Sequence, residues 1–274
     1  DTIDGDGGVN TLDYSDLDVS IVLGGSGEIL KTGLGTDTIT GFNGTTSANS
    51  GTIIGSATQT NTIDGQLNAA GNGSFVIDLS QELLTVNIST PGVGPFTFNV
   101  ENFDNVVGTQ NDDSIIGNTN ANVFTASAGD DFYDGLVDGD DDTITYEGLG
   151  ESITLLDTGD ILKGGSLGTD SIDNIETIIA DSTATNNTID GEDNAGVSFT
   201  VDLAAESLTV NIASGPVVNS TIVNFDDVFG TAGDDNITGD GQANILTGNA
   251  GNDVLSGGEG ADTLAGGDGN DVLF

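Results

Sequence analysis

Short runs in which apolar and polar residues alternate recur along the chain, and clusters of Gly, Asp and Asn separate them. In one of the longest runs every second residue is apolar, as at Phe75, Ile77 and Leu79. A period of two is typical of a β-strand with one buried face, and no segment shows the apolar stripe of an amphipathic helix. The pattern therefore predicts an all-β protein of short strands, each about three to seven residues long, joined by turns.

A period of nine residues is superimposed on this alternation near the C-terminal end. Its units share the form G-x-x-x-x-[D/N]-x-[I/L]-x. Five of them follow one another, beginning at Gly230, Gly239, Gly248, Gly257 and Gly266. The same register returns upstream at Gly5, Gly108, Gly117 and Ala126, with looser forms at residues 33–39 and 165–172. Glycine suits turns that need positive φ angles, so each unit predicts a turn followed by a strand that points one apolar residue into a narrow core.

A larger repeat encloses these units. NTIDG at Asn61 returns at Asn187, SFVIDLSQELLTVNI at Ser74 returns as SFTVDLAAESLTVNI at Ser198, and GEILKTGLGTDTI returns as GDILKGGSLGTDSI. These matches predict two tandem copies, residues 1–134 and 135–274, the second ending in the nonapeptide block 230–274. Because no linker separates the copies, we expect them to form a single continuous rod.

The nonapeptide resembles the repeat G-G-x-G-x-D-x-U-x of the RTX (repeats-in-toxin) family, a calcium-binding parallel β-helix. The resemblance implies a right-handed parallel β-roll or β-helix solenoid in which two nonapeptides make one turn. It also implies that calcium lies between stacked loops, bound by Asp carboxylates and loop carbonyls. The stacked pairs would be Asp235 with Asp253, Asn244 with Asp262, Asp253 with Asp271, and Asp113 with Asp131.

The composition agrees with an oxygen-ligated metal and excludes several other partners. The chain carries 45 Asp and Glu against two Lys and Arg, for a net charge of −43, and it has no His and no Cys. Thiolate and imidazole metal sites are therefore excluded, and the remaining oxygen ligands favour hard cations such as calcium. Phosphate backbones and anionic lipids would be repelled, and no apolar run approaches the roughly 20 residues of a membrane span.

Calcium is expected to act as a folding cofactor. Carboxylates stacked about 5 Å apart repel by about 3 kcal/mol per pair at an effective dielectric near 20. Summed over several turns, this repulsion exceeds the stability of a typical domain. We therefore expect several Ca²⁺ ions to be needed for the fold.

The candidate metal ligands fall into three groups. The sixth-position residues of the clear repeats are Asp113, Asp131, Asp235, Asn244, Asp253, Asp262 and Asp271. The looser repeats contribute Asp37 and Asp170, and the acidic run 138–142, which partly resembles the start of an EF-hand, contributes Asp142. An amide oxygen is a weaker ligand, so two alternatives stay open for Asn244 and for its equivalents Asn10, Asn61, Asn122 and Asn187: these turns hold no ion, or their amides stack as a ladder.

The remaining polar and aromatic residues have simpler interpretations. Lys31 and Lys163 occupy equivalent positions in the two copies and are expected to be solvated or paired locally. Tyr14, Tyr133 and Tyr146 are expected to pack in the core or against turns.

The sequence favours a calcium-binding structural or adhesive segment of a secreted or cell-surface bacterial protein, not an enzyme. Export by type I secretion is implied by the family resemblance. Two alternatives remain: a polysaccharide-modifying β-helix enzyme using carboxylates such as Asp130 and Asp131, which would lack the usual Arg and His, and a sugar- or ice-binding face of outward Thr and Asn.

Both ends of the sequence lie inside repeats, without a polar cap. A longer parent protein is therefore expected. Because open β edges recruit further strands, calcium-promoted association from end to end is also expected.

Overall fold

The computed structural model describes residues 1–4, 10–24, 28–40, 51–66, 73–88, 95–137, 139–191, 194, 196–213, 215 and 217–274. Strands and turns make up nearly all of this part of the chain, together with two short 3₁₀ helices, η1 (Leu79–Gln81) and η2 (Gly164–Ser166). None of the described helices is long and apolar enough to cross a membrane. The prediction of an all-β fold is confirmed.

The chain divides into two compact units, residues 1–142 and 143–274. The first five residues of the nonapeptide at Gly5, and Asp138 of the acidic run, lie outside the described residues. The joining of the two copies into one continuous rod stays a prediction.

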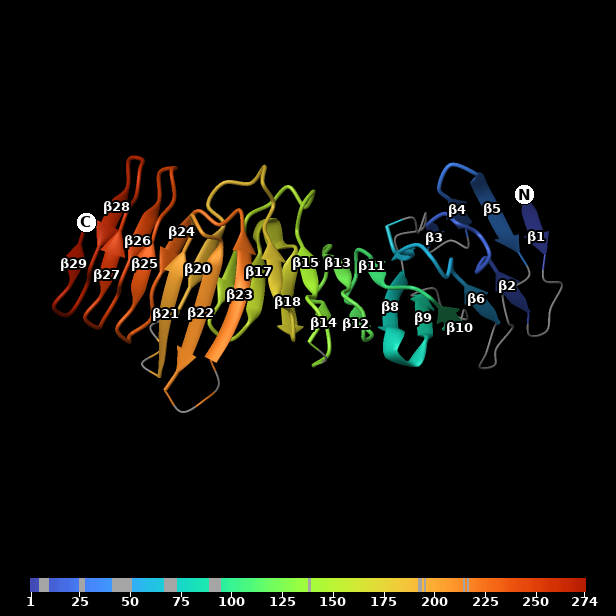
Figure 1. The fold of residues 1–274 in the computed structure, drawn as a ribbon, viewed down its shortest axis with the longest axis horizontal. Helices are drawn as coiled ribbons and strands as arrows, with labels where there is room; N and C mark the ends of the chain where they lie inside the picture. Colours follow the sequence, from blue (N-terminus) through green and yellow to red (C-terminus); the bar gives the residue numbers. More distant parts are fainter. Residues whose placement is uncertain are drawn as a thin grey trace. The chain divides into compact units, whose positions relative to one another are not determined.

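The strands of unit 1 form two sheets (Figure 1). In hydrogen-bonded order the first contains β1 (Thr2–Asp4), β5 (Gly35–Thr40), β4 (Glu28–Lys31), β3 (Ile21–Gly24), β7 (Thr62–Asp64), β11 (Asn105–Val107) and β13 (Val123–Thr125). The second contains β2 (Thr11–Asp13), β6 (Thr52–Ile54), β10 (Phe96–Glu101), β9 (Leu83–Ile88), β8 (Gly73–Asp78), β12 (Ser114–Ile116) and β14 (Phe132–Asp134).

Unit 2 is built in the same way from two sheets. In hydrogen-bonded order the first contains β15 (Thr143–Thr145), β19 (Thr177–Ile179), β23 (Val217–Val223), β22 (Ser207–Ile212), β21 (Val197–Asp202), β25 (Asn236–Thr238), β27 (Val254–Ser256) and β29 (Val272–Leu273). The second contains β18 (Gly168–Asp173), β17 (Asp160–Lys163), β16 (Ile153–Leu156), β20 (Thr188–Asp190), β24 (Asp227–Phe229), β26 (Ile245–Thr247) and β28 (Thr263–Ala265).

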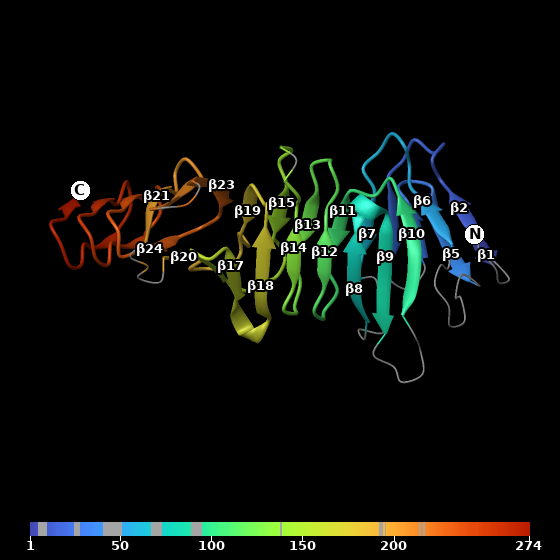
Figure 2. The same cartoon turned by 90° about the horizontal axis from the view of Figure 1, so that it is seen from below.

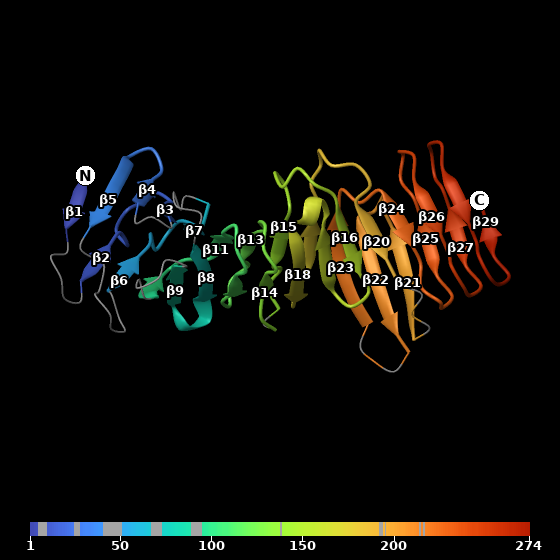
Figure 3. The ribbon, with the colours of Figure 1, turned by 180° about the vertical axis from the view of Figure 1, so that it is seen from behind.

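The nonapeptide block of unit 2 is a parallel β-roll with 18 residues in each turn. Strands β25, β27 and β29 are parallel, with Ile237 opposite Leu255 and Leu255 opposite Leu273 (Figure 3). In the other sheet Leu246 lies opposite Leu264. The prediction that two nonapeptides make one turn is confirmed.

The core between the two sheets is a narrow row of single side chains. Strands β25, β26 and β27 bury their middle residues, and Ile237, Leu246 and Leu255 are fully buried while their neighbours on the strand face outward. Unit 1 has the same arrangement at Ile115 and Tyr133. One apolar residue in nine therefore accounts for most of the core of these turns.

In the described part of the chain, four antiparallel meanders interrupt the parallel ladders, and the sequence pattern did not indicate them. They are β3–β5, β8–β10, β16–β18 and β21–β23; the second is visible in Figure 2. The first strand of a meander pairs in parallel with a later strand of the chain and the third with an earlier one, as β3 does with β7 and β5 with β1. The parallel solenoid implied by the resemblance is therefore interrupted by antiparallel pairing at these four places.

Candidate metal sites at the nonapeptide turns

The sixth-position aspartates of the C-terminal block stack on one side of unit 2, as predicted. The backbone N–H of Asp235 donates to Oδ1 of Asp253 at 2.8 Å, and the N–H of Asp253 donates to Oδ1 of Asp271 at 3.1 Å. We call these three residues the aspartate column. On the other side, Asn244 donates in the same way to Asp262 at 3.1 Å. Each carboxylate thereby holds the turn that precedes it by 18 residues.

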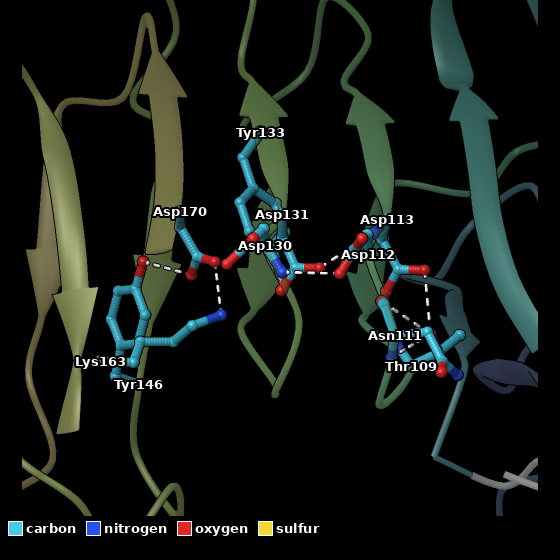
Figure 4. Close-up of polar contacts among 10 residues, drawn as sticks. All are labelled: Thr109, Asn111, Asp112, Asp113, Asp130, Asp131, Tyr133, Tyr146, Lys163 and Asp170. Atoms are coloured by element: carbon cyan, nitrogen blue, oxygen red, sulfur yellow. Dashed lines mark hydrogen bonds and ion pairs between the residues drawn. The ribbon is translucent and has the colours of Figure 1, made fainter. Parts of the chain in front are cut away.

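Unit 1 contains a matching pair, which Figure 4 shows in detail. The N–H of Asp113 donates to Oδ1 of Asp131 at 2.9 Å, and Asp113 itself accepts hydrogen bonds from the N–H groups of Phe75 and Thr109, both at 2.6 Å. Asp142 precedes strand β15 as Asp131 precedes β14. Its Oδ1 accepts the N–H of Asn122 at 2.7 Å, as Asp131 accepts that of Asp113. The acidic run therefore ends in a sixth-position turn and not in an EF-hand loop.

The second oxygen of Asp253 shows that this carboxylate does more than accept the N–H of a neighbouring turn. Oδ2 of Asp253 is buried and has no hydrogen-bond donor in the part of the chain that the structure describes. A Cβ atom placed on Gly248 would collide with this oxygen and lie 2.6 Å from the carbonyl oxygen of Gly266. Carboxylate and carbonyl oxygens thus converge beside a glycine that leaves them room.

The same convergence repeats one turn earlier. A Cβ atom on Gly230 would collide with Oδ2 of Asp235 and lie 2.7 Å from the carbonyl oxygen of Gly248. Carboxylate and carbonyl oxygens are the ligands that Ca²⁺ takes in proteins. The residues present therefore fit a hard cation at the stacked turns.

The electrostatics of these carboxylates favour a bound cation. Burial raises the pKa of Asp253 to about 6, and the charges of Asp235 and Asp271 contribute to the rise. Burial likewise raises the pKa of Asp113 to about 6, and it raises that of Asp235. Each carboxylate is charged at neutral pH at a free-energy cost that a neighbouring cation would remove.

The carboxylates act in pairs and not in larger clusters. Within the described ranges, no three Asp or Glu side chains gather closely enough to hold an ion by themselves. An ion at these turns would therefore take much of its coordination from loop carbonyls such as that of Gly266. A search for acidic clusters alone would not find such a site.

Comparison with known families agrees with this geometry. The family model of the RTX calcium-binding nonapeptide repeat matches in four copies, at residues 107–144, 224–255 and 238–273. The chain carries RTX repeats. The matched segments contain every clear sixth-position residue described above, whereas Asp37 and Asp170 lie outside them. No curated protein matches the chain.

The asparagines at the equivalent positions donate hydrogen bonds from their side-chain amides to carbonyl oxygens of neighbouring turns. Nδ2 of Asn244 donates to the carbonyl oxygen of Asp226 at 2.8 Å, while its Oδ1 accepts the N–H of Asp240 at 2.9 Å. Asn187 donates to the carbonyl oxygens of Asn224 and Asp181. Asn61 and Asn122 bond in the same manner. The amide thus bridges to loop carbonyls, which favours the first alternative, an RTX turn without an ion.

A polar ladder does form, but one position earlier in the RTX repeat. Nδ2 of Asn252 donates to Oδ1 of Asp234 at 3.0 Å, and Nδ2 of Asn270 donates to Oδ1 of Asn252 at 3.2 Å. In unit 1 the N–H of Asp130 donates to Asp112 at 2.9 Å. The fifth position therefore ties successive turns together at the surface.

Asp37 and Asp170 do not lie in turns that precede a strand, as the sixth-position residues of the clear repeats do. Asp37 lies inside strand β5 and Asp170 inside strand β18, the third strands of two meanders. Both side chains are buried and each is paired with a lysine, Asp37 with Lys31 at 2.7 Å and Asp170 with Lys163. The local pairing foreseen for the lysines is confirmed. Metal ligation by the two aspartates stays untested.

Two buried aspartates, Asp181 and Asp227, were missed by the sequence analysis. Asp181 accepts hydrogen bonds from the N–H of Gly150 at 2.6 Å and from both the N–H and the hydroxyl of Thr183, at 2.7 and 2.6 Å. These donors hold its pKa at about 2. The sequence did hold one sign of Asp181: the first copy reads IIGSAT from Ile53, whereas the second reads IIADSTAT from Ile178 and so gains an aspartate.

Proposed function

We propose that the chain is a calcium-binding structural segment of a secreted or surface-exposed bacterial protein, in which Ca²⁺ ions at the RTX turns complete the fold. The observation that carries the proposal is the buried Oδ2 of Asp253, which lacks a donor within the described residues and lies among oxygen atoms of the stacked turns. Bound calcium would supply the positive charge that these oxygens need. Secretion and an adhesive role belong to the same proposal, because RTX proteins are typically exported.

Two variants of equal charge test the calcium sites. Asp253→Asn should lower the number of bound Ca²⁺ ions and the melting temperature in calcium, because Asp253 stacks with both Asp235 and Asp271. Asp240→Asn removes the same charge from a residue outside the sixth position, whose carboxylate accepts the N–H of Gln242. It should leave the ion count unchanged. Native mass spectrometry and isothermal titration calorimetry measure both quantities.

Removal of the metal from the unmodified chain gives the second readout. Circular dichroism with and without EDTA should show loss of β structure or a large fall in melting temperature after chelation. An unchanged spectrum and melting temperature would contradict a folding role for calcium. If Asp240→Asn lost as many ions as Asp253→Asn, the assignment of the sixth position would be wrong.

Association between copies remains part of the proposal. Light scattering across a calcium titration should show growth of assemblies with Ca²⁺ and less growth with monovalent salt at the same ionic strength, because calcium neutralises carboxylates at the junction. A chain that stays monomeric at millimolar calcium would contradict association.

An ice- or sugar-binding face has weaker support. The outward residues Thr143, Thr177 and Thr221 lie in register on β15, β19 and β23. In that sheet the next strand places Ser207 opposite Thr221, so the row of threonines ends there. Three threonines make a much shorter array than a binding face of this type requires, and a structural role is favoured.

A further inference from the structure

The two lysines of this chain have largely buried side chains, although burial is the least favourable environment for a cation. They are the only Lys or Arg residues among 274, in a chain of net charge −43. An exposed acidic surface would attract them at little cost, yet only 14% of the Lys31 side chain is exposed and the Lys163 side chain is fully buried. Burying an ammonium group is costly unless a carboxylate pairs with it.

The register of each meander brings lysine and aspartate together. In unit 1 Lys31 lies opposite Gly35 and Asp37 lies opposite Ile29, so the two charged residues are diagonal neighbours on adjacent strands. In unit 2 Lys163 lies opposite Gly168 and Asp170 opposite Ile161, which gives the same diagonal. Diagonal neighbours on one face are within reach of a long side chain.

A tyrosine hydroxyl completes each site. The hydroxyl of Tyr14 donates to Oδ2 of Asp37 at 2.7 Å while Lys31 bonds to Oδ1. Tyr146 donates to Oδ2 of Asp170 at 2.9 Å while Lys163 bonds to Oδ1, and Figure 4 shows both side chains pointing at this carboxylate. Both oxygens of each aspartate are therefore occupied, in contrast to Asp253.

The charge state of Asp37 follows from these partners. Its burial acts to raise the pKa, but the hydrogen bonds from Lys31, Tyr14 and the N-terminal ammonium group, together with the charge of Lys31, outweigh burial and lower it. The opposite holds in the aspartate column, where burial and like charges raise the pKa of Asp253. A carboxylate that already faces an ammonium group offers little attraction to a divalent cation, because the ammonium repels it.

We propose that Lys31 and Lys163 are built-in cations that take the place of calcium in the first meander of each unit. Asp37 and Asp170 then bind no metal, and the meanders β3–β5 and β16–β18 hold their structure without calcium while the RTX block depends on it. This inference goes beyond the proposed function. It states that lysine neutralises the aspartates of the two meanders, whereas calcium neutralises those of the RTX block.

Ion counting on the full chain separates the two kinds of aspartate. Asp170→Asn should bind as many Ca²⁺ ions as the unmodified chain at saturating calcium, whereas Asp253→Asn should bind at least one fewer. Loss of an ion from Asp170→Asn would overturn the inference. Failure of Asp253→Asn to lose an ion would instead count against the proposed function, so the two failures are distinguishable.

Hydrogen exchange in EDTA tests the calcium independence of the meander. Amides of residues 153–173 should stay protected while those of residues 230–274 exchange rapidly. Equal exchange of both segments would overturn the inference. Lys163→Met should abolish the protection of residues 153–173, and the double variant Lys163→Met with Asp170→Asn should recover part of it, because the buried charge is then removed with its partner. A single variant as well protected as the unmodified chain would also overturn the inference.

Discussion

The nonapeptide block 230–274 and the meander β16–β18 both bury aspartates against a thin apolar core, yet they neutralise these aspartates differently. In the block, Asp253 keeps one oxygen without a donor among the described residues, and its pKa is raised to about 6. In the meander, Asp170 is occupied by Lys163 and Tyr146. The asparagine turns show a third solution, in which an amide supplies the donor. From this comparison we expect calcium to be required only where the chain supplies neither an ammonium group nor an amide donor of its own.

Converting an asparagine turn into an aspartate turn should give the largest effect. Asn244→Asp removes the donor to the carbonyl oxygen of Asp226 and adds a charge beside Asp262. In calcium-free buffer we expect the free energy of unfolding to fall by roughly 2–4 kcal/mol. In saturating calcium the loss should be recovered and one further ion bound. Chemical denaturation and native mass spectrometry measure the two outcomes.

A control for charge alone is Asn219→Asp on the exposed strand β23, where Oδ1 accepts the hydroxyl of Thr209 and can still do so. It should change stability little in either buffer. If Asn219→Asp matched Asn244→Asp, net charge and not turn chemistry would explain the result.

Filling the space beside a repeat glycine should give an intermediate effect. The methyl group of Gly248→Ala would collide with Oδ2 of Asp253 and approach the carbonyl oxygen of Gly266. We expect a loss of about 1–3 kcal/mol and weaker calcium binding. Gly241→Ala is the matched control, because a Cβ atom there has no atom of the described residues within 4 Å. If calcium titrations gave both variants the same affinity, a collision between the new methyl group and Asp253 would not explain the result.

The pH dependence of Asp181 should give the smallest effect. Its pKa is lowered from 3.8 to about 2 by donors from Thr183 and Gly150. A lowered folded-state pKa stabilises the fold fully above the unfolded value, and this contribution is lost as the pH falls through about 2. Asp181→Asn should therefore reduce the fall in stability between about pH 4 and pH 2. Parallel acid-denaturation profiles for the two proteins would contradict the assignment.

Much of the block was predictable from the sequence because its information is local. The nine-residue period places the sixth-position residues, and the family resemblance implies two nonapeptides in each turn, so together they predicted the pairing of Asp235 with Asp253 and of Asp113 with Asp131. The buried Ile or Leu two residues later followed from the same period.

The meanders were not predictable in this way. Alternation with a period of two is the same in parallel and antiparallel strands, so Phe75 and Ile77 indicated a strand but not its partner. Asp37 was grouped with the repeats because glycine, threonine and aspartate before an isoleucine also occur there, whereas its lysine partner lies on the adjacent strand β4 and its tyrosine partner directly follows β2. A hydrogen bond between residues 23 positions apart, such as that of Tyr14 with Asp37, cannot be predicted from a nine-residue pattern.

The reversed order of strands in the meanders has a consequence for how the protein comes apart. In the block, each turn is bonded to the turn 18 residues away, so turns can fray and re-form one after another from an edge. At a meander the ladder skips further: Leu23 pairs with Ile63 and Leu155 with Ile189. Opening there must break parallel pairs on both sides together, which couples neighbouring turns into one cooperative step. We therefore expect unfolding to proceed one RTX turn at a time until it reaches a meander. There it should pause, because the meander and its neighbouring turns must unfold together.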